Sequence, residues 1–305
     1  MQSTQTAFEQ AAVLPDSAAH PTWFDLRRGR LEDAPACGEI CYEAFRIIAE
    51  SHNFPPDFPS TEAATGLMTS ILSKPRVYSV VAESDGRILG SNFLWEDTIA
   101  GVGPITVDPT AQNGAIGRSL MQDVLDYCHR KGFAGVRLVQ AAYHNRSLSL
   151  YAKLGFEVRE PLATIQGPAI HEQTPGYDIR PAGDQDMEAC NALCYEIHGH
   201  ARSAEVSEAI QQATATVVVR NGRITGYATA IGFFGHAVAK TTEDLKALIA
   251  AAPAVAGPGF LLPTRNAEVF RWCLEKKLRV VQPMTLMSMG FYDEPAGSFL
   301  PSILY

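Results

Sequence analysis

Apolar side chains between residues 107 and 156 recur with the periods of alternating strands and helices. Six of them predict an amphipathic helix by their spacing: Ile116, Leu120, Met121, Val124, Leu125 and Cys128. This helix begins directly at a glycine-bearing turn, which follows a strand that ends near Val107. Further on, the pattern predicts a buried strand over 136–141, a helix from about Asn145 to Lys153, and a stop at Gly155 and Phe156.

The chain also contains an internal repeat. The segment FDLRRGRLEDAPACGEICYEAF, beginning at Phe24, aligns without a gap with YDIRPAGDQDMEACNALCYEIH, beginning at Tyr177. Each segment reads as a strand, a turn and a helix. The hairpin sequence DGRILGSNF from Asp85 likewise matches NGRITGYAT from Asn221. We therefore expect a second domain of the same fold to begin near Tyr177.

The turn before the first predicted helix has the chemistry of an anion site. The backbone N–H groups from Asn113 to Gly117 are the unpaired donors of a helix N-terminus, and a diphosphate could accept them. Each such charge-assisted hydrogen bond contributes about 1.5–3 kcal/mol. If the turn requires a left-handed backbone at Ala115, that residue costs about 1–2 kcal/mol.

These motifs resemble the GNAT superfamily of acyl-CoA-dependent N-acetyltransferases. The turn is similar to the family motif Q/R-x-x-G-x-G/A, with Gln112, Ala115 and Gly117 at the marked places and alanine where glycine is usual. The later helix is similar to N-x-x-S/A-x-x-L-Y-x-K-x-G-F. The residues in register are Ser147, Leu150, Tyr151, Lys153, Gly155 and Phe156. His144 replaces the family's asparagine, with Asn145 one step late.

The resemblance implies an α/β (α+β) fold with two GNAT-like domains, each a mixed, mostly antiparallel central sheet flanked by helices. The expected parts are a mobile segment 1–21, an acetyl-CoA-binding catalytic domain 22–168, a linker 169–175, and a degenerate domain with a C-terminal tail, 176–305. The second copy has no room for the turn between Ala239 and TTEDLKALIAAA, and Cys273 stands opposite Tyr151. We expect it to shape the acceptor cleft of the first copy.

The resemblance also implies acetyl-CoA as the acyl donor, without a metal. The expected cofactor-binding residues are Ile105, Thr106, Val107, Gln112, Asn113, Gly114, Ala115, Ile116, Gly117, Arg118, His144, Asn145 and Ser147. Tyr151 falls at the general-acid position, and its unperturbed pKa near 10 keeps it protonated at pH 7. An amine with a pKa near 10.4 requires a base. We select Glu96 as this base, with Asp97, Glu43 and Glu50 as alternatives.

The predicted function is direct transfer of an acetyl group from acetyl-CoA to the primary amine of a small molecule. A non-catalytic acyl-CoA-binding or regulatory protein is the alternative. The altered positions Ala115 and His144 favour this alternative, whereas the retained Tyr151 favours an enzyme.

Composition adds few constraints. A net charge of −8 argues against a nucleic-acid partner and weakly favours cationic substrates. No apolar run is long enough to span a membrane, and the N-terminus lacks the pattern of a signal peptide, so we expect a cytoplasmic protein with no membrane partner. Cys37 and Cys41 lie on an apolar helix stripe, which indicates core packing and not zinc binding. The oligomeric state is left open.

Overall fold

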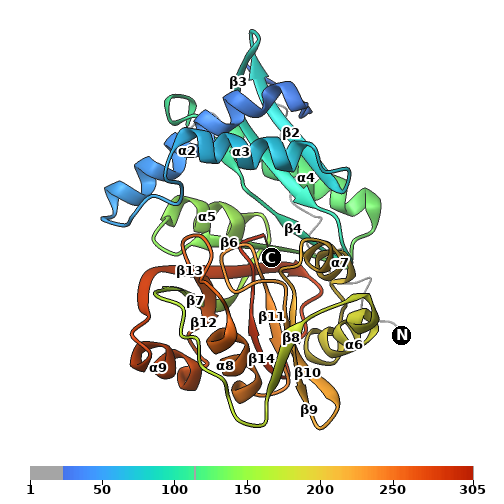
Figure 1. Ribbon diagram of the computed structural model, residues 1–305. Helices are drawn as coiled ribbons and strands as arrows, with labels where there is room; N and C mark the ends of the chain where they lie inside the picture. The colour runs from blue at the N-terminus through green and yellow to red at the C-terminus, as the bar shows by residue number, and fades with distance from the viewer. Residues whose placement is uncertain (1–22, 113–114, 305) are drawn as a thin grey trace.

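The computed structural model describes residues 23–112 and 115–304, and the expected mobile segment 1–21 lies outside them. The first half contains β1 (Asp25–Arg28), α2 (Ala34–Ser51), α3 (Thr61–Leu72), β2 (Val77–Ser84), β3 (Arg87–Trp95), β4 (Ile99–Val102), β5 (Thr106–Val107), α4 (Ile116–Lys131), β6 (Gly135–Ala141), α5 (Asn145–Lys153) and β7 (Glu157–Gln166). Figure 1 shows this half, in blue to green, above the second.

The second half follows a closely similar order of elements. It contains β8 (Asp178–Pro181), α6 (Met187–His198), α7 (Ser203–Gln211), β9 (Thr216–Arg220), β10 (Arg223–Ala228), β11 (Ala237–Ala239), α8 (Thr242–Ala251), β12 (Phe260–Pro263), α9 (Ala267–Glu275), β13 (Arg279–Gly290) and β14 (Ser298–Leu300). The predicted fold class, with mostly antiparallel sheets flanked by helices, is confirmed.

Helices cover both faces of the first sheet because the side chains of its strands alternate. Val81 and Phe93 pack in the cluster with α2 and α3, whereas Val80 and Leu94 pack in the cluster with α4. Cys37 on α2 is free and fully buried in the first of these clusters. Burial raises the pKa of its thiol to about 11, so it remains an uncharged packing residue.

Helix α4 forms as its apolar spacing predicts. It begins at Ile116, and its six predicted apolar residues are all buried. Ala115 precedes it as the N-cap, with φ 65° and ψ −5°. This left-handed conformation is the strained one that the sequence suggested for alanine at this position. The backbone is therefore strained at Ala115, where the loop turns directly into the helix.

The two halves exchange strands within one nine-stranded sheet, counted over the described residues. Its order is β1-β2-β3-β4-β6-β13-β7-β12, with β5 pairing with β3. Strand β13 of the second half pairs antiparallel with both β6 and β7, so that Leu286 lies opposite Val139 on one side and Glu160 on the other. The expected domains 22–168 and 176–305 are thus interleaved, and Figure 1 shows β13 crossing the junction between them.

The remaining strands form a second sheet in the order β14-β11-β10-β9-β8. Strand β14, near the C-terminus, pairs antiparallel with β11, and Val238 lies opposite Phe299. The C-terminal segment is therefore built into the second copy of the fold. Within the described part of the chain, no helix is long and apolar enough to cross a membrane.

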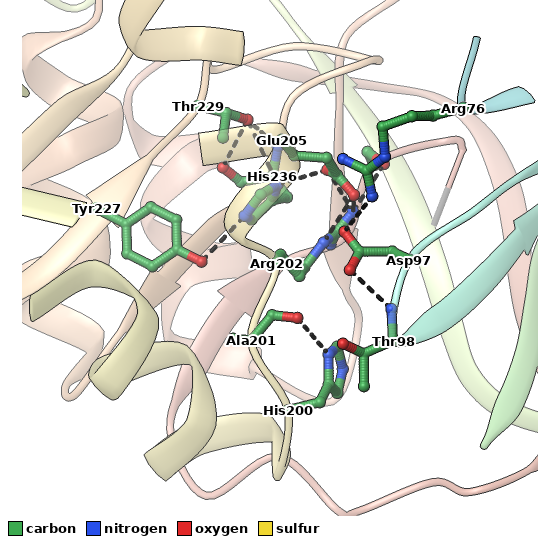
Figure 2. A network of polar contacts seen from close by, with 11 residues as sticks. Arg76, Asp97, Thr98, His200, Ala201, Arg202, Glu205, Tyr227, Thr229 and His236 are labelled. Atoms are coloured by element: carbon green, nitrogen blue, oxygen red, sulfur yellow. Dashed lines mark hydrogen bonds and ion pairs between the residues drawn. The ribbon is translucent and has the colours of Figure 1, made fainter. Parts of the chain in front are cut away.

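A polar network links the α6–α7 region of the second half to the neighbourhood of Asp97 in the first (Figure 2). Arg202 forms an ion pair with Glu205 at 2.7 Å, and Glu205 lies 3.0 Å from Nδ1 of His236. Tyr227 contacts the other ring nitrogen of His236 at 3.0 Å. Burial and the nearby guanidinium of Arg202 lower the pKa of His236 to about 4. This histidine is therefore neutral at pH 7.

Candidate active site

A cavity of about 680 Å³ lies between the two halves. Its walls come from the end of α2 and the loop before α3, from the segment between β4 and β5, from the start of α4, and from β6 and α5. The second half contributes Phe233, Phe234, Gly257, Pro258, Met284, Ile303 and Leu304. The cavity is thus assembled from both copies of the fold.

Two strands part where they reach the cavity. β4 and β6 pair in parallel only from Ile99 opposite Gly135 to Gly101 opposite Arg137. From Val102 and Leu138 onward, both segments line the cavity instead. Parting frees backbone amide and carbonyl groups that a paired strand would use, and an inserted ligand can take their place as hydrogen-bonding partner.

Most of the predicted cofactor-binding residues meet at this cavity. Those that line it are Ile105, Thr106, Val107, Gln112, Ala115, Ile116, Gly117, Arg118, His144 and Ser147. Asn145 is exposed and is not among the lining residues. Asn113 and Gly114 lie outside the described residues.

The N-terminus of α4 forms the cationic end of the cavity. Arg118 and Arg146 both line this end, and Arg146 donates a hydrogen bond of 3.1 Å to the side-chain oxygen of Gln112. The first turn of α4 carries no acidic residue. A helix N-terminus with two guanidinium groups and no carboxylate suits a phosphate-bearing ligand.

Three side chains on α5 form a hydrogen-bonded row. His144, Ser147 and Tyr151 are spaced by three and then four residues, so they lie along one helix face. Nδ1 of His144 lies 2.8 Å from Oγ of Ser147, and Ser147 hydrogen-bonds Tyr151 in turn. All three line the cavity. The row thus connects a ring nitrogen to a phenol through one hydroxyl group.

The protonation states within this row follow from burial. Burial raises the pKa of Tyr151 to about 12, an effect that the hydrogen bond from Ser147 partly offsets. Burial, together with the positive charge of Arg146, lowers the pKa of His144. At pH 7 the tyrosine is therefore a proton donor, and the histidine is a neutral group able to accept a proton.

Glu96, the predicted base, does not line the cavity. Its carboxylate accepts a hydrogen bond of 2.8 Å from Tyr127 instead. Glu43 and Glu50 both pair with Arg46, at 2.7 and 2.6 Å. Glu96 follows Trp95 in the turn between β3 and β4, where the packing of α4 against the sheet brings Tyr127 to it.

Asp97, the remaining alternative base, also lies away from the cavity lining. It belongs to the polar network between the halves, with its carboxylate 3.8 Å from Arg76 (Figure 2).

Sequence reasoning missed the carboxylate that does line the cavity, Asp57. It lies in the loop between α2 and α3, and its Oδ1 accepts a hydrogen bond of 3.0 Å from the side-chain amide of Gln282 on β13. The same Gln282 accepts a hydrogen bond of 3.1 Å from Tyr143. Burial raises the pKa of Asp57. No local motif marks this residue, because its partner belongs to the other half of the chain.

The corresponding region of the second copy is filled by the protein itself. Only Lys240 and Thr241 connect β11 to α8, as the sequence indicated. In the first turn of α8, the fully buried carboxylate of Asp244 accepts hydrogen bonds of 2.6 Å from Thr225 and from Thr241. The edge of β11 that would border a ligand pairs with β14.

Comparison with known proteins identifies the class of protein. Residues 42–156 match the acetyltransferase (GNAT) family. An IAA acetyltransferase from Azospirillum brasilense is 30% identical over 119 residues, which cover 38% of this chain and 78% of the relative. The chain therefore belongs to the GNAT family and is a GNAT-type N-acetyltransferase.

Solved structures with similar folds span almost the whole chain. A protein from Pyrococcus horikoshii has a TM-score of 0.70 at 14% identity and covers 96% of both chains. A GCN5-related N-acetyltransferase from Sphaerobacter thermophilus has a TM-score of 0.61 at 15% identity, covering 92% of this chain and all of that one (100%). A tandem GNAT protein from the clavulanic acid biosynthesis pathway has a TM-score of 0.53 at 13% identity, covering 88% and 98%. The paired fold thus recurs at low sequence identity.

Proposed function

We propose that this enzyme transfers the acetyl group of acetyl-CoA directly to the primary amine of a small molecule. The observation that carries the proposal is the single cavity that joins the N-terminus of α4 to the phenol of Tyr151. One end of this cavity suits a diphosphate, and the other presents a proton donor. Between them, the parted strands β4 and β6 leave backbone groups for the extended arm of the donor.

The donor is held by groups of the first half. The free amides at the start of α4 bind the diphosphate, and Arg118 and Arg146 add positive charge. Gly117 lies in the first turn of α4, where a small side chain can be accommodated. A Cβ there would lie 3.7 Å from Val107 and 3.8 Å from Leu150, so a methyl group would fit without displacing its neighbours.

Tyr151 acts on the leaving sulfur. As the amine nitrogen bonds to the carbonyl carbon, the carbon–sulfur bond breaks and the thiolate takes the phenolic proton of Tyr151. His144 accepts a proton from the attacking nitrogen at Nε2 and passes the proton on Nδ1 through Ser147 to the phenolate. The row on α5 thereby carries one proton from nitrogen to sulfur and leaves His144 as its Nε2–H tautomer, which returns to the Nδ1–H tautomer by proton exchange with water before the next turnover.

Titration calorimetry with acetyl-CoA and with CoA, followed by a thiol-release assay over a panel of amines, tests this function. We expect binding of acetyl-CoA and release of free thiol that depends on an added amine. Binding without thiol release for any amine would instead indicate a non-catalytic acyl-CoA-binding protein. Absence of acetyl-CoA binding would overturn the proposal entirely.

A further inference from the structure

The cavity contains one carboxylate that the transfer of a single proton does not use, that of Asp57. Among the described lining residues it is the only acidic side chain. Gln282 donates to its Oδ1, and no described donor contacts its Oδ2. It also forms no ion pair within the described residues, whereas Glu43 and Glu50 on α2 both pair with Arg46. Asp57 is half-buried in the free cavity, and a ligand that covers it removes the carboxylate further from water; without a cation partner this is unfavourable, and a cationic ligand relieves the cost.

The charges of the cavity are separated along its length. Arg118 lies in the first turn of α4 and Arg146 in the first turn of α5, whereas Asp57 lies in the loop between α2 and α3. The cationic end matches the diphosphate of the proposed donor. The anionic end matches an ammonium group, the form in which an alkylamine of pKa near 10.4 reaches the enzyme at pH 7.

The walls around Asp57 are apolar and come from both halves. Phe45 and Phe58 face each other with ring centroids 6.1 Å apart. The second half adds Phe233, Phe234 and Met284, and the C-terminal segment adds Ile303 and Leu304. The side chain of Phe234 remains 48% exposed, which leaves apolar surface uncovered at this cavity. Such walls gain free energy by covering a hydrocarbon body and offer few partners to hydroxyl groups.

We propose that the acceptor is a small primary amine with an apolar or aromatic body, whose amino group is recognised by Asp57. This inference rests on the proposed function. Two protons must leave the nitrogen of an ammonium substrate during acetylation, whereas one reaches the sulfur. Asp57 takes the first proton and releases it to solvent, and the row on α5 carries the second. Gln282 is a positioning residue, because it holds the carboxylate from the opposite half.

The first experiment compares apolar primary amines with hydroxyl-bearing primary amines in the thiol-release assay with acetyl-CoA. We expect phenethylamine and hexylamine to exceed ethanolamine and glucosamine by at least about tenfold in kcat/KM, because their hydrocarbon bodies are removed from water against the apolar walls. Equal or reversed preference would overturn the inference while leaving the proposed function standing. No thiol release with any amine would overturn both. The same assay is repeated with acyl-CoA donors of longer chain. A preference that follows the acyl chain and not the amine would assign the apolar walls to the donor, which also overturns the inference.

The second experiment tests recognition of the cation by Asp57→Asn, with Glu96→Gln as a matched control outside the cavity. Phenyltrimethylammonium carries a permanent charge and cannot be acetylated. We expect it to inhibit the wild type competitively against phenethylamine, and to bind Asp57→Asn at least about tenfold more weakly. The variant should also show a raised KM for the amine and an unchanged affinity for acetyl-CoA. Gln282→Leu should fall between the two.

Equal inhibition of wild type and Asp57→Asn would exclude Asp57 as the cation partner. Loss of acetyl-CoA affinity in the same variant would indicate a structural role and would equally overturn the assignment. Thermal unfolding of both variants shows whether each one is folded. If Asp57→Asn does not fold, Asp57→Glu keeps the charge in place and must retain inhibition by phenyltrimethylammonium for the inference to stand.

Discussion

Helices α4 and α8 occupy equivalent places in the two copies of the fold, but their N-termini face different groups. The N-terminus of α4 follows a left-handed alanine, carries no acidic residue in its first turn, and opens into the cavity. The N-terminus of α8 holds the buried carboxylate of Asp244, bonded to two threonine hydroxyls. The positive end of the helix dipole thus faces an open cavity at α4, whereas at α8 it lies next to a carboxylate of the protein itself.

The strands beside these helices differ in the same way. In the first copy β4 and β6 part and expose backbone groups, whereas in the second copy β14 pairs with the edge of β11. The second copy therefore loses both features that a diphosphate and an extended arm require. It keeps a structural purpose, because its strand β13 lies inside the first sheet. In the second copy, side chains and a strand of the chain itself occupy the place that is an open cavity in the first copy. The second copy nevertheless contributes a strand that the sheet of the first copy requires.

Removing the second half should have the largest effect. A fragment of residues 1–167 leaves β6 and β7 without β13, the strand that lies between them. The fragment also lacks the buried side chains Leu286 and Met287 of that strand. We expect no cooperative unfolding transition by circular dichroism and at least a thousandfold loss of thiol release. A fragment with full activity would show that the two copies are independent. The intact chain with Glu96→Gln serves as the active control.

Replacing Tyr151 by phenylalanine should lower kcat by about tenfold to a thousandfold, because the leaving thiolate loses its proton donor while the ring still packs. The affinity for acetyl-CoA, measured by calorimetry, should be nearly unchanged. Tyr127→Phe removes the same group outside the cavity, where it bonds Glu96, and should leave kcat unaltered. Parallel losses of binding and rate would make Tyr151 a structural residue.

The difference between α4 and α8 predicts one acetyl-CoA per chain. Gly117→Asp imitates the acidic first turn of α8 and should weaken acetyl-CoA binding by about 10- to 100-fold, the cost of one to two kcal/mol or slightly more at a charged hydrogen bond. Gly117→Ala is the matched control and should bind as the wild type does, since the space is available. Two equivalent sites in the wild-type titration, or residual tight binding by half of the sites in Gly117→Asp, would contradict this prediction.

The smallest effect on activity at pH 7 is expected from His236→Asn, at the junction of the halves. The folded-state pKa of His236, about 4, lies below its ordinary value of 6.5. The unfolded chain therefore binds the extra proton first, and stability is present above pH 6.5 and lost as the pH falls towards 4. The loss is on the order of a few kcal/mol. Denaturant unfolding at several pH values should show a shallower pH dependence in the variant. Identical slopes would assign acid sensitivity to other groups, such as His198 and His200, whose pKa values burial also lowers.

Local pattern was sufficient for the elements that form the donor side of the site. The spacing of apolar residues predicted the start of α4 and both bounds of α5, since helix formation depends on neighbours three and four positions apart. The sequence also predicted the strain at Ala115 and the missing turn before α8. These features depend on backbone chemistry within a few residues. The repeat further indicated that the fold occurs twice.

Only the tertiary structure decided how the two copies meet. The placement of β13 between β6 and β7 is a choice of strand partner, which the pattern within a single strand does not specify. The pairing of Asp57 with Gln282 joins residues 225 positions apart, so no local spacing could reveal it. Glu96 was predicted as the base and is hydrogen-bonded to Tyr127. The sequence by itself thus determined the donor-binding motif and the duplicated fold, whereas the acceptor side depends on long-range register, which short-range periodicity does not encode.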